Sequence, residues 1–143
     1  MSLHSVRRML IILAVVISGI SIAADPVGTD RLSTEEIRQV FANVRDDARV
    51  QDAAGTTAVN FWYADGSFTN AWSNQHGSGT VQGRWRAQDG KRCIVITAGL
   101  PERIGKESCS RVLRRGQEYL SLNPDGSIHG IHTLTPMAGA QRP

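Results

Sequence analysis

The chain has 143 residues, of which 41% are hydrophobic and 20% charged, and a formal net charge of +3. This is the usual size of one small domain, so we expect one domain rather than two. Two of the positive charges, Arg7 and Arg8, precede an apolar run; without them the net charge is +1, which gives no support to nucleic-acid binding.

The first 23 residues have the layout of a cleavable signal peptide, with two arginines, an apolar run over 9–17 and small residues before Ala24. We predict cleavage after Ala23 and a periplasmic or secreted mature protein. An uncleaved membrane anchor is the alternative. The apolar stretch 9–24 is 16 residues long, short of the roughly 20 that cross a bilayer, so no membrane span is expected after cleavage.

Residues 24–31 have no periodicity and are predicted to be a flexible lead-in to a single domain over 32–135. Ser33 and Glu36 then form the pattern of a capping box, which predicts a helix start. Apolar residues recur after it at helical spacing, at Ile37, Val40, Phe41 and Val44. These features predict an amphipathic helix over about 34–45, with the acidic pair 46–47 following its end.

From residue 56 onward, short β-branched and aromatic runs alternate with turn dipeptides such as Asp65-Gly66, Asp89-Gly90 and Asp125-Gly126, as is typical of antiparallel hairpins. Six strands are predicted, with a seventh candidate over 127–134. The six cover 56–63, 67–72, 80–87, 91–98, 108–115 and 118–122. The predicted fold class is α+β: one N-terminal amphipathic helix packed on a curved antiparallel β-meander or incomplete barrel of about 6–7 strands, followed by a flexible tail over 136–143.

The chain has two cysteines, Cys93 and Cys109, which allow one intramolecular pairing in an exported protein. A disulfide between them would close a loop of 17 residues and, on the chain-entropy model, stabilise the fold by about 3 kcal/mol. Because the spacing is not C-x-x-C, we interpret the pair as structural, with a redox role as the alternative.

Catalytic and metal-binding patterns are weak, so no catalytic residue, metal or cofactor is assigned. His129 and His132 lie in a predicted strand, where an odd separation sends side chains to opposite faces, and joint metal ligation would need a bend in the strand or His76 from a loop. Ser78, two residues after His76, lacks the strand and G-x-S-x-G pattern of a nucleophile. A small hydrolase or metal-binding protein using His76, Ser78, His129 and His132 is the alternative function.

A candidate binding surface combines aromatic and basic residues. The predicted strand through Trp62 carries aromatic side chains on both faces, and residues 81–143 hold a net charge of +5 against −4 for residues 24–80. Core aromatics and a solvated basic face are the alternatives. The surface comprises Trp62, Tyr63, Trp72, Arg84, Arg86, Arg111, Arg114 and Arg115, with Lys91 and Arg92 beside Arg84 and Arg86 at a predicted turn.

The order of motifs resembles a family of short exported bacterial proteins of unknown function. The motifs are Leu32-Ser33-x-x-Glu36-Ile37-x-x-Val40-Phe41, Tyr63-x-Asp65-Gly66, Gly83-x-Trp85, Asp89-Gly90-x-x-Cys93, Cys109, Tyr119 and Asp125-Gly126. The resemblance implies a leading helix and an antiparallel sheet, and it carries over no catalytic residue.

The function expected from these observations is that of an exported binding or accessory protein with no evident catalytic site. Its partner would be an apolar small ligand held in the curved sheet, or an anionic envelope component or protein bound through the basic C-terminal half.

Overall fold

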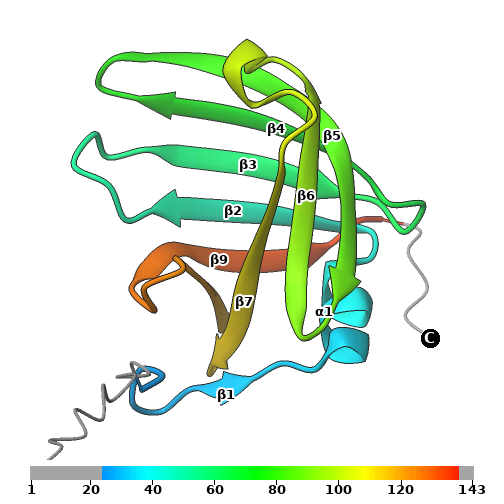
Figure 1. Ribbon diagram of the computed structural model, residues 1–143, viewed down its shortest axis with the longest axis vertical. Helices are drawn as coiled ribbons and strands as arrows, with labels where there is room; N and C mark the ends of the chain where they lie inside the picture. The colour runs from blue at the N-terminus through cyan, green and yellow to red at the C-terminus, as the bar shows by residue number, and fades with distance from the viewer. Residues whose placement is uncertain (1–23, 139–143) are drawn as a thin grey trace, which may run out of the picture.

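The computed structural model describes residues 24–138, and most of them belong to one antiparallel sheet (Figure 1). The predicted signal peptide and the last five residues of the predicted tail lie outside this range. The elements are β1 (Asp30–Arg31), α1 (Thr34–Phe41), β2 (Val44–Val50), β3 (Thr57–Trp62), β4 (Ser67–Asn74), β5 (Gly77–Gln88), β6 (Lys91–Ala98), the 3₁₀ turn η1 (Pro101–Arg103), β7 (Glu107–Arg115), β8 (Glu118–Leu122) and β9 (Ile128–Pro136).

The sheet closes on itself, so the predicted α+β fold with an open meander or incomplete barrel is wrong. Each strand from β2 to β9 pairs with its neighbour in the chain, and β2 also pairs with β9, which completes a ring of eight antiparallel strands. The short strand β1 is an addition to this ring and pairs with β7. Over the described residues the protein is therefore mainly β: a closed barrel with one eight-residue α-helix.

The error arises at β2, which the prediction assigned in part to the helix. The helix ends at Phe41 rather than at 45, because Asn43 takes a positive φ of 55°, a left-handed conformation that cannot continue a right-handed helix. Along β2, Val44, Asp46 and Ala48 are buried, whereas the residues between them are exposed. Val44 fits both the helical stripe and this period of two, and only its pairing with β3 and β9 decides between them.

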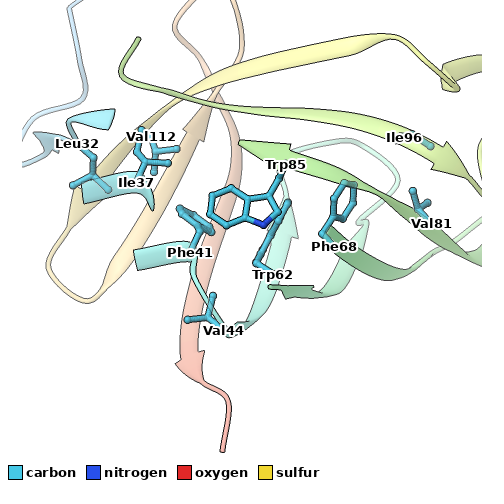
Figure 2. Close-up of a cluster of buried hydrophobic side chains, with 10 residues drawn as sticks. All are labelled: Leu32, Ile37, Phe41, Val44, Trp62, Phe68, Val81, Trp85, Ile96 and Val112. Atoms are coloured by element: carbon cyan, nitrogen blue, oxygen red, sulfur yellow. The ribbon is translucent and has the colours of Figure 1, made fainter. Parts of the chain in front are cut away.

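The start of the helix is confirmed. The Ser33 side chain accepts a hydrogen bond from the Glu36 amide, and the Glu36 carboxylate accepts one from the Ser33 amide at 2.8 Å. The helix lies at one end of the barrel, and η1 lies at the other (Figure 1). Figure 2 shows Phe41, at the end of α1, pointing toward Trp62 and Trp85. The Phe41 ring is 5.8 Å from Trp62 and 6.4 Å from Trp85, so the helix closes its end of the barrel with aromatic packing.

All seven predicted strands are present as β3 to β9, with ends that differ by at most three residues. The predicted disulfide is also confirmed: Cys93 on β6 and Cys109 on β7 are directly opposite each other, with Cα atoms 3.9 Å apart. The bond joins two neighbouring strands of the barrel and fixes their register.

Candidate functional site

The barrel encloses a cavity of about 380 Å³. Inward-facing residues of β2, β3, β4, β5, β6 and β9 line it, because side chains on one face of a strand recur every second residue. At the end closed by α1, the lining includes Trp62 and Phe68. At the other end it includes Asp52, Leu100 and Arg103, which belong to the connections between strands. The cavity therefore extends from the helix toward the loops at the opposite end.

The two sides of the cavity differ in polarity. The side formed by β4, β5, β6 and the start of the β6–β7 connection is mainly apolar, with Phe68, Trp72, Val81, Ile94, Ile96 and Leu100. Asparagines line the side formed by β3 and the facing positions of β4. Asn70 donates a hydrogen bond to Asn60 at 2.6 Å, and Asn74 donates one to Thr56 at 3.0 Å. A ligand would meet one apolar wall and one hydrogen-bonding wall.

Asp46 is fully buried at the end of the barrel near the helix, and three donors surround it. Its carboxylate accepts hydrogen bonds from Asn60 at 3.0 Å, from Trp62 Nε1 at 2.9 Å and from His132 Nδ1 at 3.0 Å. Burial by itself would raise the pKa of Asp46, but the hydrogen bond and charge of His132, followed by Arg92 and Trp62, lower the pKa below its ordinary value. The carboxylate is therefore ionised and its hydrogen-bonding capacity is largely used.

His132 connects Asp46 to a serine. Its Nε2 lies 2.9 Å from Ser121 Oγ on the adjacent strand β8. When the His132 ring is neutral with its proton on Nδ1, Nε2 accepts a hydrogen bond from the serine hydroxyl, which is the order of groups in a nucleophile, base and acid triad. A side chain at Gly130 would meet both Ser121 Oγ and His132 Nε2 at 3.2 Å. The Ser121 side chain is nevertheless closed off, since the residue is only 1% exposed.

Arg92 is a buried cation without an anionic partner. It is 8% exposed, and its guanidinium carbon lies 4.4 Å above the Phe41 ring and 4.5 Å from the Trp62 ring. Among residues 24–138, no acid lies within ion-pair distance of it and its Nη1 has no hydrogen-bond partner. Burial lowers the pKa of Arg92 to about 10, with Asp46 acting in the opposite direction, so the side chain remains charged at neutral pH.

The structure separates the aromatic and basic parts of the predicted binding surface. Trp62 and Trp72 line the cavity, whereas Tyr63 is 36% exposed just after β3. The five arginines lie on β5 and β7 and already have partners. Their contacts are Arg84 with the Asp65 carbonyl at 2.8 Å, Arg86 with Glu107 at 2.8 Å, Arg111 with Asp25 at 2.7 Å, Arg114 with Asp30 at 3.8 Å and Arg115 with Glu118 at 3.1 Å.

The structure changes the interpretation of the histidines. Pairing between β8 and β9 shifts from Ser121–Gly130 to Leu122–Ile128, which leaves His129 as an extra residue in a bulge. His129 and His132 consequently both line the cavity, and the expectation that they face opposite sides of the strand is wrong. Burial lowers the pKa of His129, with nearby His132 and Arg92 acting in the same direction.

The other two residues of the predicted hydrolase or metal site lie elsewhere. His76 is exposed in the turn between β4 and β5, where it contacts Gln75 at 3.2 Å, and Ser78 is exposed on β5. Within the described range, the group with metal-ligand spacing is Cys93, Glu107 and Cys109, and both of its sulfurs are in the disulfide. No helix between residues 24 and 138 is long and apolar enough to cross a membrane.

Comparisons with family models, with curated proteins and with solved structures give no match. The resemblance to short exported bacterial proteins therefore remains a prediction, and the function must be argued from the cavity.

Sequence reasoning missed Asp46 and Ser121 as site residues and placed Arg92 on the surface. Two patterns contain the missing information. Val44, Asp46, Ala48 and Val50 alternate with Arg45, Asp47 and Arg49, which is the pattern of a strand with an acid on its apolar face. Arg92 likewise shares the spacing of Ile94 and Ile96.

Proposed function

We propose that this chain is an exported binding protein that holds a small, mainly apolar molecule inside its barrel. The main observation that supports this proposal is the cavity of about 380 Å³, with one apolar wall and a few convergent polar groups. Cavities of roughly 300–1,000 Å³ with this lining are typical of small-molecule sites. Export is supported by the disulfide, since such bonds persist mainly in oxidising compartments, and by the predicted signal peptide.

Small residues at inward positions favour a ligand over a core filled by side chains. An eight-stranded barrel has an interior that side chains can fill or that can hold one small ligand. Here Ala48 and Ala58 line the cavity on β2 and β3, and Gly130 lines it on β9. Larger side chains at these positions would occupy the space that remains open.

The test compares two identical substitutions on neighbouring strands. Ala58 is buried and lines the cavity, whereas Ala71 on β4 is exposed. We expect the mature protein and Ala71→Phe to bind the apolar fluorophore 1-aminoanthracene saturably, and Ala58→Phe to lose this binding. Equal binding by both variants, or no binding of the probe by the unsubstituted protein, would contradict the proposal.

Binding of an anionic envelope component or protein through the basic C-terminal half is less well supported. Arg111 and Arg115 are already engaged by acids of this chain, at 2.7 Å and 3.1 Å. Exposed ion pairs are weak, so these arginines are not excluded as contacts, but no cavity or unpartnered buried group accompanies them among the described residues. The observations favour the barrel interior.

A hydrolase is the second candidate, and the Ser121–His132–Asp46 chain is the observation that favours it. The distances of 2.9 Å and 3.0 Å match an activated serine. A fluorophosphonate probe distinguishes the two functions by intact mass. Because Ser121 is 1% exposed, the binding proposal predicts no adduct; an adduct that Ser121→Ala abolishes would establish a reactive nucleophile and favour the hydrolase.

A further inference from the structure

Arg92 places an unpaired positive charge at the end of the cavity near the helix. Its Nη1 has no hydrogen-bond partner within the described chain, and the guanidinium packs against the rings of Phe41 and Trp62. Cation–π contacts offset part of the cost of burying a charge, but they leave the N–H donors unsatisfied. Buried donors in native proteins nearly always have an acceptor, so this group requires one from outside the chain.

The nearest acid does not supply that acceptor. Asp46 attracts Arg92 electrostatically, but its oxygens already accept hydrogen bonds from Asn60, Trp62 and His132. No ion pair joins Asp46 and Arg92 within residues 24–138. The protein has therefore satisfied its buried anion with its own donors and left its buried cation free.

A second arginine borders the same cavity. Arg103 and His129 line it toward the loops, and Asp52 is the acid there. The pKa of His129 is lowered first by burial and then by His132, Arg92 and Arg103, with Asp52 as the opposing charge. His129 is therefore neutral at neutral pH, and the lining holds two arginines, Arg92 and Arg103, against the single acid Asp52, an excess of positive charge that favours an anion.

We infer that the ligand carries a carboxylate, which the Arg92 guanidinium binds while the apolar body packs on the wall formed by β4, β5 and β6. This inference rests on the proposed function and names the head group of the ligand that the same cavity would bind. A single guanidinium presents parallel N–H donors that match one carboxylate. A dianionic phosphate would bring a second negative charge close to Asp46 with one cation to balance it, so a monoanion fits the site better.

The test uses three ligands with one body: decanoate, decanol and decylamine, each titrated by calorimetry into the mature protein. We expect decanoate to bind about tenfold or more tightly than decanol, as a charge-assisted hydrogen bond provides, and decylamine to bind most weakly. In Arg92→Met, decanoate should lose its higher affinity relative to decanol, while the affinity for decanol should be unchanged. Arg86→Met, the same substitution at an exposed position outside the cavity, is the matched control and should keep the advantage.

The possible outcomes test the carboxylate assignment and the binding proposal separately. Equal binding of decanoate and decanol, or a decanoate advantage that survives in Arg92→Met, would overturn the carboxylate assignment and leave the binding proposal intact. No binding of any of the three would count against the cavity as a ligand site. Methionine keeps an unbranched apolar stem and removes an unpaired buried charge, so Arg92→Met is expected to fold.

A second readout needs no variant. Decanoate labelled with ¹³C at the carboxyl carbon reports its own titration by NMR. Contact with Arg92 would lower the pKa of the bound carboxyl below that of free decanoate, because a neighbouring cation stabilises the charged form. An unchanged or raised carboxyl pKa in the complex would contradict the assignment.

Discussion

Asp46 shows how one buried acid organises the interior. It accepts hydrogen bonds from β3 through Asn60 and Trp62, and from β9 through His132. Since β2 lies between β3 and β9 in the barrel, this single carboxylate joins three adjacent strands. It also holds His132 in the orientation that reaches Ser121.

Asp46→Asn should destabilise the fold by about 3 kcal/mol at neutral pH, because the amide group would face buried donors and leave them unpaired. The pKa of Asp46 is lowered from 3.8 in the fold, so the stability it contributes is present above about pH 4 and is lost as the pH falls through the folded-state pKa. In urea unfolding, the difference in free energy of unfolding between the unsubstituted protein and Asp46→Asn should therefore become smaller below pH 4. Val59→Ala, at a half-buried position between Ala58 and Asn60, is the control. Its difference in free energy of unfolding from the unsubstituted protein should not change with pH. A pH-independent difference for Asp46→Asn would contradict this role.

At the scale of elements, glycine and cysteine fix the pairing of β5, β6 and β7. The β5–β6 register shifts between Gln82 and Gly83. A Cβ at Gly83 would overlap the Val95 carbonyl oxygen and lie 2.6 Å from the Phe68 ring. The backbone therefore approaches its neighbours too closely for any side chain at this position.

Gly83→Ala should cost about 3 kcal/mol, the upper end for overpacking in a core, as measured by urea unfolding. Gly105→Ala is a comparison variant without overpacking, since a Cβ there meets nothing within 4 Å. Any loss of stability in Gly105→Ala would come from the φ of 75° at that position, which strains a residue with a side chain. If Gly83→Ala were as stable as the unsubstituted protein, the close approach of β5 to Phe68 would be wrong.

Removal of the disulfide tests the β6–β7 pair. Cys93→Ala with Cys109→Ala opens a 17-residue loop and should lower the free energy of unfolding by about 3 kcal/mol. Reduction of the unsubstituted protein should produce a loss of similar size. A loss below about 0.5 kcal/mol in both would show that the bond adds little beyond the strand pairing.

At the scale of the whole molecule, β9 closes the barrel. It pairs with β2 on one side and β8 on the other, and it supplies Gly130 and His132 to the cavity. Without it, two strand edges would be left open and Asp46 would lose a donor.

Truncation after Ser127 should therefore abolish cooperative unfolding and favour association through the exposed edges. Truncation after Ala138 is the control and removes no described residue. Size-exclusion chromatography and urea unfolding report both effects. A monomeric, cooperatively folding product of the shorter chain would show that closure by β9 is dispensable.

The strands from β3 to β9, the helix start at Ser33 and the disulfide could be predicted from the sequence because each depends on local patterns. Alternation, turn dipeptides, a capping box and a single cysteine pairing all act within or between adjacent segments. The same local reasoning placed Trp62 and Trp72 on a candidate binding surface with core packing as the alternative, and in the structure both line the cavity.

Closure of the barrel and the composition of its site were decided by tertiary structure. Val44 satisfies both a helical stripe and a strand, and pairing with the distant strand β9 selects the strand and turns Asp46 inward, toward His132, 86 residues further along the chain. The bulge at His129 likewise exists only in the pairing of β8 with β9. Contacts of this kind depend on which distant strands meet, and a period of two or 3.6 along one segment carries no information about them.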